Sequence, residues 1–238
     1  MNEDHHAPAY WRLPTGQSLR REAHFDSRLV RCFASRPSGI ASLLREAADR
    51  HPQLEALVDG AQRWTWAQLK TASTRIATGL RRLGVMRGDR VALLMGNRAE
   101  FVLAFYAIAQ CGAVAVPVSP RDSAKGISFI LNQCAARAVI AQSDLAHLLP
   151  VELGDGSALQ QVLCSGADGL AAPQTGDVTR WDELSVGGGA AEANDGVDEH
   201  DEIEQSPAII LYTSGTTGQP KGAVITRSEE HTSELQSR

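Results

Sequence analysis

Residues 212–222 are the segment that most constrains how this 238-residue chain can fold and what it can bind. They read Tyr-Thr-Ser-Gly-Thr-Thr-Gly-Gln-Pro-Lys-Gly and lie between two short apolar runs, 207–211 and 223–226. Both runs are typical of buried strands. Glycines leave backbone N–H groups open to an anion, hydroxyl side chains add donors, and a lysine adds a compact positive charge. The sequence therefore predicts a polyphosphate-binding loop between two strands.

The candidate ligands of that polyphosphate are the hydroxyl, glycine and lysine residues of the loop. They are Thr213, Ser214, Gly215, Thr216, Thr217, Gly218 and Lys221. The hydroxyl groups and the lysine would contact the anion, whereas the glycines would allow the backbone to approach it. Pro220 would stiffen the exit from the turn.

Two other interpretations of the loop are open. The spacing from Gly215 to Lys221 fits a Walker A loop, but Pro220 replaces its second glycine and Gly222 replaces its magnesium-binding hydroxyl residue. The segment that follows is also β-branched instead of helical, which disfavours a Walker site. The second alternative is a hairpin without a ligand. It is disfavoured because a bare hairpin needs only about two to five turn residues.

The loop resembles the signature of the acyl-adenylate-forming, AMP-binding synthetases. This family includes acyl-CoA synthetases, the adenylation domains of peptide synthetases, and firefly-type luciferases. Four upstream segments match the family in order and spacing, namely 63–69, 84–92, 97–100 and 112–117. The resemblance runs from about Ser38 to Thr226 and is greatest to an acyl-CoA synthetase or fatty-acid–CoA ligase.

The expected fold class is α/β. The resemblance implies an incomplete N-terminal domain of the adenylate-forming synthetase fold, with helix-flanked, largely parallel sheets and without the C-terminal domain. The residue pattern agrees, since strand-like runs at 91–95, 113–118 and 138–141 alternate with helical patterns. Such alternation predicts parallel strands joined by helical crossovers.

Two capping boxes are predicted at helix starts. Thr65 with Gln68 would begin one helix, whose apolar stripe ends at Gly84. Asn97 with Glu100 would begin the next.

The chain divides into three predicted parts. Residues 1–37 are expected to be an irregular tail, and 38–226 a partial AMP-binding domain with an acidic, glycine-rich loop at 185–205. Residues 227–238 resemble the translation of a sequencing-library adapter, and we expect them to be non-native. The alternative is a natural polar tail.

The resemblance implies a two-step ligase. ATP would activate a small-molecule carboxylic acid to an acyl-adenylate with release of pyrophosphate, and coenzyme A would then take the acyl group as a thioester. Mg²⁺ would accompany ATP. A non-catalytic nucleotide-binding module and a peptide-synthetase-type adenylation domain are the alternatives.

Several parts that the family places after this loop are missing from the chain. They are an adenine pocket, a Thr–Glu pair that serves magnesium, an aspartate for the ribose, and a C-terminal domain with the catalytic lysine. We therefore expect no catalytic residue and no metal ligand here, and an inactive fragment.

Composition favours a cytoplasmic protein without a nucleic-acid partner. The net charge is −5, and the basic residues are scattered instead of forming a stripe. The four cysteines lack metal or CxxC spacing and are expected to be reduced thiols. They are Cys32, Cys111, Cys134 and Cys164.

No transmembrane segment is expected. The chain opens without an export signal, and Gly112 and Pro117 divide the apolar run 101–118 into a helix and a strand. Peripheral membrane contact by the complete enzyme stays open.

Overall fold

A computed structural model of the chain describes residues 18–24, 28–34, 36–150, 161–165, 177–185, 206–213 and 220–226. The described strands are β1 (Leu19–His24), β2 (Arg28–Phe33), β3 (Glu55–Asp59), β4 (Gln62–Thr65), β5 (Arg90–Leu94), β6 (Val114–Val118), β7 (Ala136–Gln142), β8 (Gln161–Ser165), β9 (Asp177–Arg180), β10 (Pro207–Thr213) and β11 (Lys221–Thr226). The helices are α1 (Ile40–Arg50), α2 (Trp66–Arg82), α3 (Ala99–Gln110), α4 (Ala124–Gln133) and α5 (Trp181–Ser185), with a 3₁₀ helix η3 at Ser143–Leu148.

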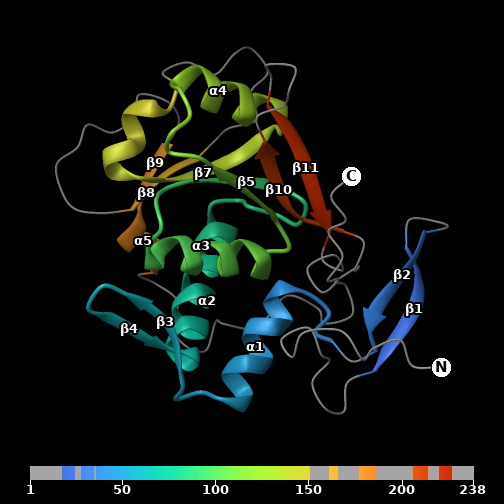
Figure 1. The fold of residues 1–238 in the computed structure, drawn as a ribbon. Coiled ribbons are helices and arrows are strands. Elements are labelled where there is room, and N and C mark those ends of the chain that lie inside the picture. Colours follow the sequence, from blue (N-terminus) through green and yellow to red (C-terminus); the bar gives the residue numbers. More distant parts are fainter. Residues whose placement is uncertain are drawn as a thin grey trace.

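The described residues form an α/β layered structure around a seven-stranded sheet (Figure 1). The strand order is β11-β10-β6-β5-β7-β8-β9. Every neighbouring pair is parallel except β10 with β11. In Figure 1, α4 lies on one side of the sheet, and α2 and α3 lie on the other. The predicted α/β class with a largely parallel sheet is confirmed.

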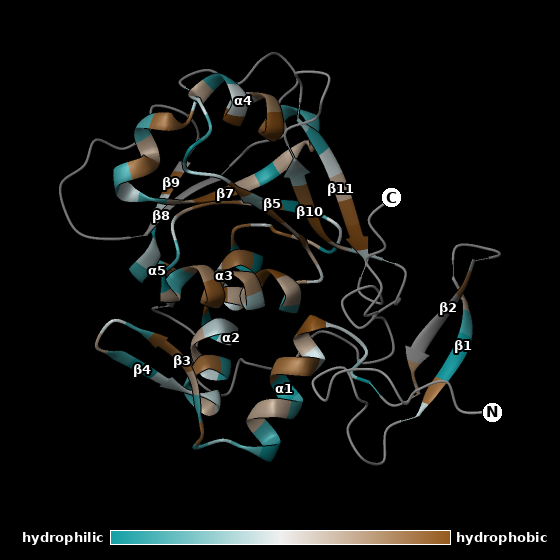
Figure 2. Cartoon of the chain, in the orientation of Figure 1, coloured by the Kyte–Doolittle hydropathy of each residue, from teal (hydrophilic) through white to brown (hydrophobic). Residues whose placement is uncertain are grey.

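The centre of the sheet is buried on both faces. Along β5, Val91 and Leu93 pack on the cluster that contains residues of α2 and α3, whereas Ala92 and Leu94 pack on the cluster that contains residues of α4. All four are fully buried. Parallel strands covered on both faces are expected to be continuously apolar, as the strand-like runs are (Figure 2).

The start of α2 confirms the first predicted capping box. Gln68 donates its backbone N–H to Thr65 Oγ1 at 3.3 Å, and the Thr65 N–H donates to Gln68 Oε1 at 2.8 Å. The helix then buries Leu69, Ile76 and Leu80 against α3 and the sheet. This cap forms within one turn of chain, so the sequence alone could predict it.

The predicted capping box of Asn97 and Glu100 is wrong. Helix α3 begins at Ala99, and its N-cap residue Arg98 makes no side-chain cap. The Ala99 N–H instead donates to Asp59 Oδ2 at 2.8 Å. Glu100 accepts two hydrogen bonds from Arg98, at 2.7 and 2.8 Å. A carboxylate from the end of β3, distant in sequence, therefore caps this helix.

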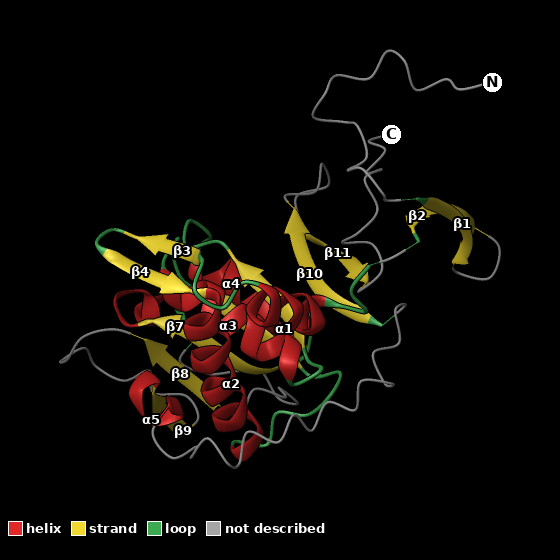
Figure 3. Cartoon of the chain, turned by 90° about the horizontal axis from the view of Figure 1, so that it is seen from below, coloured by secondary structure: helices red, strands yellow, loops and turns green. Residues whose placement is uncertain are grey.

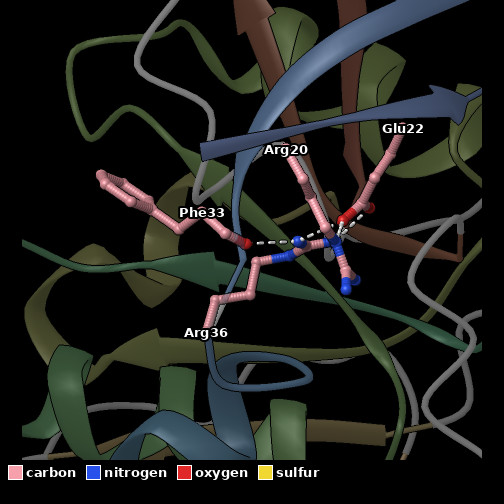
Figure 4. A network of polar contacts seen from close by, with 4 residues as sticks. All are labelled: Arg20, Glu22, Phe33 and Arg36. Atoms are coloured by element: carbon pink, nitrogen blue, oxygen red, sulfur yellow. Dashed lines mark hydrogen bonds and ion pairs between the residues drawn. The ribbon is translucent and has the colours of Figure 1, made fainter. Parts of the chain in front are cut away.

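The expectation of an irregular tail over residues 1–37 does not hold for residues 19–24 and 28–33. There β1 and β2 form an antiparallel hairpin, which Figures 1 and 3 place outside the main layers. Arg36 anchors it, since the guanidinium donates to Glu22 at 2.7 and 2.9 Å and to the Phe33 carbonyl at 2.8 Å (Figure 4).

The same contacts perturb a carboxyl group. Hydrogen bonds from Arg36 lower the pKa of Glu22 from 4.5 to about 2; burial opposes this shift, and a hydrogen bond from Arg20 adds to it. Glu22 is therefore ionised throughout the neutral range, and the pair fastens β1 to the segment that leads into α1.

The apolar run 101–118 forms most of α3 and then β6, as predicted. Within the part of the chain that the structure describes, no helix combines the length and apolar character needed to cross a bilayer. The acidic loop is described only at Ser185 of its 185–205 range, and the tail 227–238 lies outside the described residues.

Candidate functional site

The strands β10 and β11 flank the predicted polyphosphate loop, so both strand predictions are confirmed. They pair in antiparallel register with Thr213 opposite Lys221. The two ends of the loop are thereby held next to each other. Residues 214–219 lie outside the described residues, so the predicted contacts of five candidate ligands stay predictions. These five are Ser214, Gly215, Thr216, Thr217 and Gly218.

Thr213 and Lys221 are both exposed. Opposite residues of an antiparallel pair project to the same face, so the hydroxyl and the ammonium group lie on one side of the hairpin. No described residue forms an ion pair with Lys221 within the ranges given above. As far as the described residues go, this exposed ammonium has no carboxylate partner and is available to an anion.

The loop follows β10 at the carboxyl edge of the parallel strands. β10 runs parallel to β6, with Ile209 opposite Ala115. The carboxyl ends of β5, β6 and β10 therefore meet at one edge of the sheet. The chain leaves β5 for α3 on one side of the sheet and leaves β6 for α4 on the other (Figure 1). In open α/β sheets, ligands bind at this edge, where connections diverge to opposite faces.

The segment 84–92, which matches the family upstream, has a structural role. The Arg90 guanidinium donates to the carbonyls of Cys134 and Ala135, both at 2.6 Å. The Asp89 carboxylate accepts the Met86 N–H at 2.8 Å. The Arg90 bonds join the start of β5 to the end of α4, and the Asp89 bond closes the turn before β5, so this motif supports the sheet at the edge opposite to the loop.

Two of the four cysteines are described as free thiols. Burial raises the pKa of Cys111 and of Cys134 to about 11, so both are protonated at neutral pH. Neither is a nucleophile under those conditions, because the reactive form is the thiolate. The side chains of Cys32 and Cys164 lie outside the described part.

Sequence reasoning missed one pocket, of about 270 Å³, between β3 and the start of α3. Its polar lining comes from Asp59, Asn97 and Arg98, and its walls are apolar. Asp59 and Arg98 are already engaged, by the Ala99 N–H and by Glu100. No predicted loop residue lines this pocket.

Comparison with known proteins identifies the family. The family model described as AMP-binding enzyme matches residues 44–237, which include the loop and both its strands. The chain belongs to this family.

Proteins with similar sequences in the AMP-binding enzyme family include a fatty-acid ligase. Long-chain-fatty-acid–CoA ligase FadD13 of Mycobacterium tuberculosis is 36% identical over 195 residues, which cover 81% of this chain and 36% of that protein. A solved Mycobacterium tuberculosis fatty acyl CoA synthetase is 32% identical, with a TM-score of 0.58 over 80% of this chain and 35% of that one.

A third similarity concerns the fold alone. The anthranilate CoA ligase AuaEII, solved with anthranoyl-AMP, has a TM-score of 0.68 at 23% identity and covers 80% of this chain and 35% of that one. In each of these comparisons, the chain spans about a third of the length of the protein that it matches.

Proposed function

We propose that a full-length protein containing this chain is an acid–thiol ligase of the acyl-CoA synthetase type. A carboxylate oxygen attacks the α-phosphorus of ATP, and the bond from that phosphorus to the oxygen bridging to the β-phosphorus breaks. The products of this step are an acyl-adenylate and pyrophosphate. The sulfur of coenzyme A then attacks the acyl carbonyl carbon, AMP leaves, and the thiol proton is released.

One observation carries this proposal: inside the family-matched segment, the hairpin register brings Thr213 opposite Lys221 at the two ends of the predicted loop. During the first step, negative charge grows on the departing β- and γ-phosphates. A fixed ammonium and fixed hydroxyl and N–H donors stabilise that charge more than they stabilise the ground state. Lys221 would act as an electrostatic clamp in this role.

The metal requirement is part of the proposal. Mg²⁺ usually reaches such sites with the phosphates of its nucleotide and one or two protein carboxylates. Within the described ranges, His, Cys, Asp and Glu form no group of three that fits a metal. The described residues therefore provide no such site, and no catalytic step is assigned to the metal.

The acyl substrate and the location of the protein are also proposals. The similarity to long-chain-fatty-acid–CoA ligases favours a fatty acid as the carboxylate and coenzyme A as the acceptor. We further propose that the protein acts in the cytoplasm without a nucleic-acid partner.

The chain alone is proposed to bind ATP weakly and to lack ligase activity. Correct geometry at the reacting atoms requires groups on several sides of the substrate. The candidate loop supplies donors for the polyphosphate only.

Carboxylate-dependent exchange of pyrophosphate into ATP tests the proposal on the completed gene. We expect exchange with fatty acids, and a loss of about 10- to 100-fold in Lys221→Ala, because a hydrogen bond to a charged group contributes about 1.5–3 kcal/mol. The matched control is Lys70→Ala, which removes a surface ammonium paired with Asp49 and should keep exchange.

Two results would overturn the proposal. Absence of exchange by the completed protein with every carboxylate would refute the ligase assignment. Full exchange by the 238-residue chain alone would refute the claim that the fragment is inactive.

A further inference from the structure

Tyr212 and Gly222 form the next pair of the hairpin, one step away from the pair of Thr213 and Lys221. Residues opposite each other share a face of the sheet, and neighbouring pairs alternate between faces. Tyr212 packs on the cluster that contains residues of α4. Gly222, which is itself exposed, therefore shares the face of Tyr212, and Lys221 projects from the other face.

The ring of Tyr212 occupies the space that a side chain at position 222 would need. A Cβ built on Gly222 would lie 3.1 Å from Cζ and 3.4 Å from Cε2 of Tyr212. It would also lie 2.9 Å from Cγ2 of Ile210. Cβ atoms in proteins essentially never approach another heavy atom closer than 3.0 Å, so an alanine here would force Ile210 to shift, and the Tyr212 ring would have to yield by a few tenths of an ångström.

Backbone conformation is not the reason for a glycine at this position. The described glycines with positive φ are Gly60, Gly84, Gly88 and Gly112, and Gly222 is not among them. The requirement at 222 is close approach of the aromatic ring to the backbone of β11. Glycine in a strand commonly marks such an approach.

The ring, and not the hydroxyl group, makes this contact. Tyr212 is half-buried, and burial raises the pKa of its phenol, which keeps the hydroxyl neutral. Within the described part of the chain, no hydrogen bond to that hydroxyl is found. The contribution of Tyr212 to the hairpin is thus its ring, whose Cζ and Cε2 atoms occupy the space beside Gly222.

We propose that the Tyr212 ring, seated on Gly222, positions Lys221 for the polyphosphate. The ring holds β11 against β10 at the point where the loop returns, and this fixes the backbone of Lys221 opposite Thr213. Tyr212 is a positioning residue, since it lies on the opposite face from the ammonium group. The inference rests on the proposed function, because it concerns how the same loop meets its anion.

The test measures binding of inorganic tripolyphosphate to the 238-residue chain by isothermal titration at several salt concentrations. We expect Gly222→Ala and Tyr212→Leu to weaken binding by about 5- to 10-fold, less than the roughly 100-fold that a 1 Å misplacement costs in catalysis. Tyr212→Phe keeps the ring and should bind like the wild type. Gly126→Ala is the matched control, because its Cβ would meet only ordinary contacts of 3.5 Å or more.

The salt dependence separates positioning from a general loss of stability. Salt screens the attraction between Lys221 and the anion, so a variant that withdraws the ammonium should show a flatter salt dependence. Lys221→Ala and Gly222→Ala should flatten it to a similar degree. The double variant Tyr212→Leu/Gly222→Ala should bind no more weakly than the weaker-binding single variant, since both changes remove the same contact.

The outcomes distinguish the two proposals. If Lys221→Ala binds like the wild type, Lys221 does not hold the polyphosphate, and both the clamp role that the proposed function gives it and the positioning role of Tyr212 fail. If Lys221→Ala weakens binding but Gly222→Ala and Tyr212→Leu do not, or if these keep the wild-type salt dependence, only the positioning role is refuted. Circular dichroism identifies a variant that does not fold. If either Gly222→Ala or Tyr212→Leu does not fold, binding by the other variant decides the outcome.

Discussion

Leu93 in β5 is fully buried, whereas Val224 in β11 is 52% exposed, although both strands belong to the same sheet. Helices cover both faces of the sheet at β5, and the apolar residues of this strand are those that packing alone would select. The β10–β11 hairpin instead carries an exposed threonine and lysine at its loop end. Packing does not select those residues, so the binding role that we propose for them rests on their chemistry and on the family match.

The first prediction concerns the sheet centre, where the largest effect is expected. Ile140→Ala in β7 should lower the free energy of unfolding by about 2–5 kcal/mol, because it removes a fully buried side chain and leaves a cavity. Urea unfolding followed by circular dichroism measures the change. A loss below about 1 kcal/mol would contradict the description of this strand as the core.

The second prediction concerns the cap of α3. Asp59→Ala should cost about 1 kcal/mol, because the Ala99 N–H loses its acceptor. Asn97→Ala is the matched control and should change stability by less than about 0.5 kcal/mol, as surface substitutions do. Urea unfolding measures both changes. If Asn97→Ala were the destabilised variant instead, the helix would be capped by Asn97, as the sequence predicted.

The third prediction uses the pKa of Glu22, which falls from 4.5 to about 2 on folding. A lowered pKa stabilises the folded hairpin fully above about pH 4.5, and this contribution is lost as the pH falls through about 2. The protection of the β1 and β2 amides against hydrogen exchange, relative to the intrinsic exchange rate at each pH, should therefore fall across that range. In Arg36→Ala, the acid-dependent step should become smaller, because only the hydrogen bond from Arg20 would then lower the pKa of Glu22. An unchanged step would show that another carboxyl group is responsible.

The fourth and smallest effect is expected on the exposed edge of the sheet. Val224→Thr should change the free energy of unfolding by less than about 0.5 kcal/mol, because water already reaches the side chain. Urea unfolding measures the change, and comparing it with the change in Ile140→Ala sharpens the contrast between the edge and the centre of the sheet. A loss as large as that in β7 would mean that the edge is packed like the core.

The parts of the fold that were predictable from sequence depend on local patterns. Continuous apolar runs predicted β5, β6 and β7, and the cap at Thr65 forms within one turn. The cap at Ala99 was missed because its acceptor, Asp59, comes from another element. The β1–β2 hairpin was missed because an ion pair anchors it at Arg36, and apolar periodicity does not reveal such a contact.

The candidate site shows the same limit. Residue types within the loop predicted its anion chemistry, and the flanking strands followed from their apolar runs. The contact between Tyr212 and Gly222 was not predictable, because it depends on the register of two strands and on the direction in which a ring lies.

Titration of the isotopically labelled chain with ATP, followed by backbone amide NMR, tests most directly whether the loop between β10 and β11 binds the nucleotide. We expect chemical-shift changes at Thr213, Lys221 and the residues between them, with the amides of β7 unaffected. The proposed site would be contradicted if the amides of that hairpin stayed unchanged while those around Asp59 and Asn97 shifted, because ATP would then occupy the pocket beside α3.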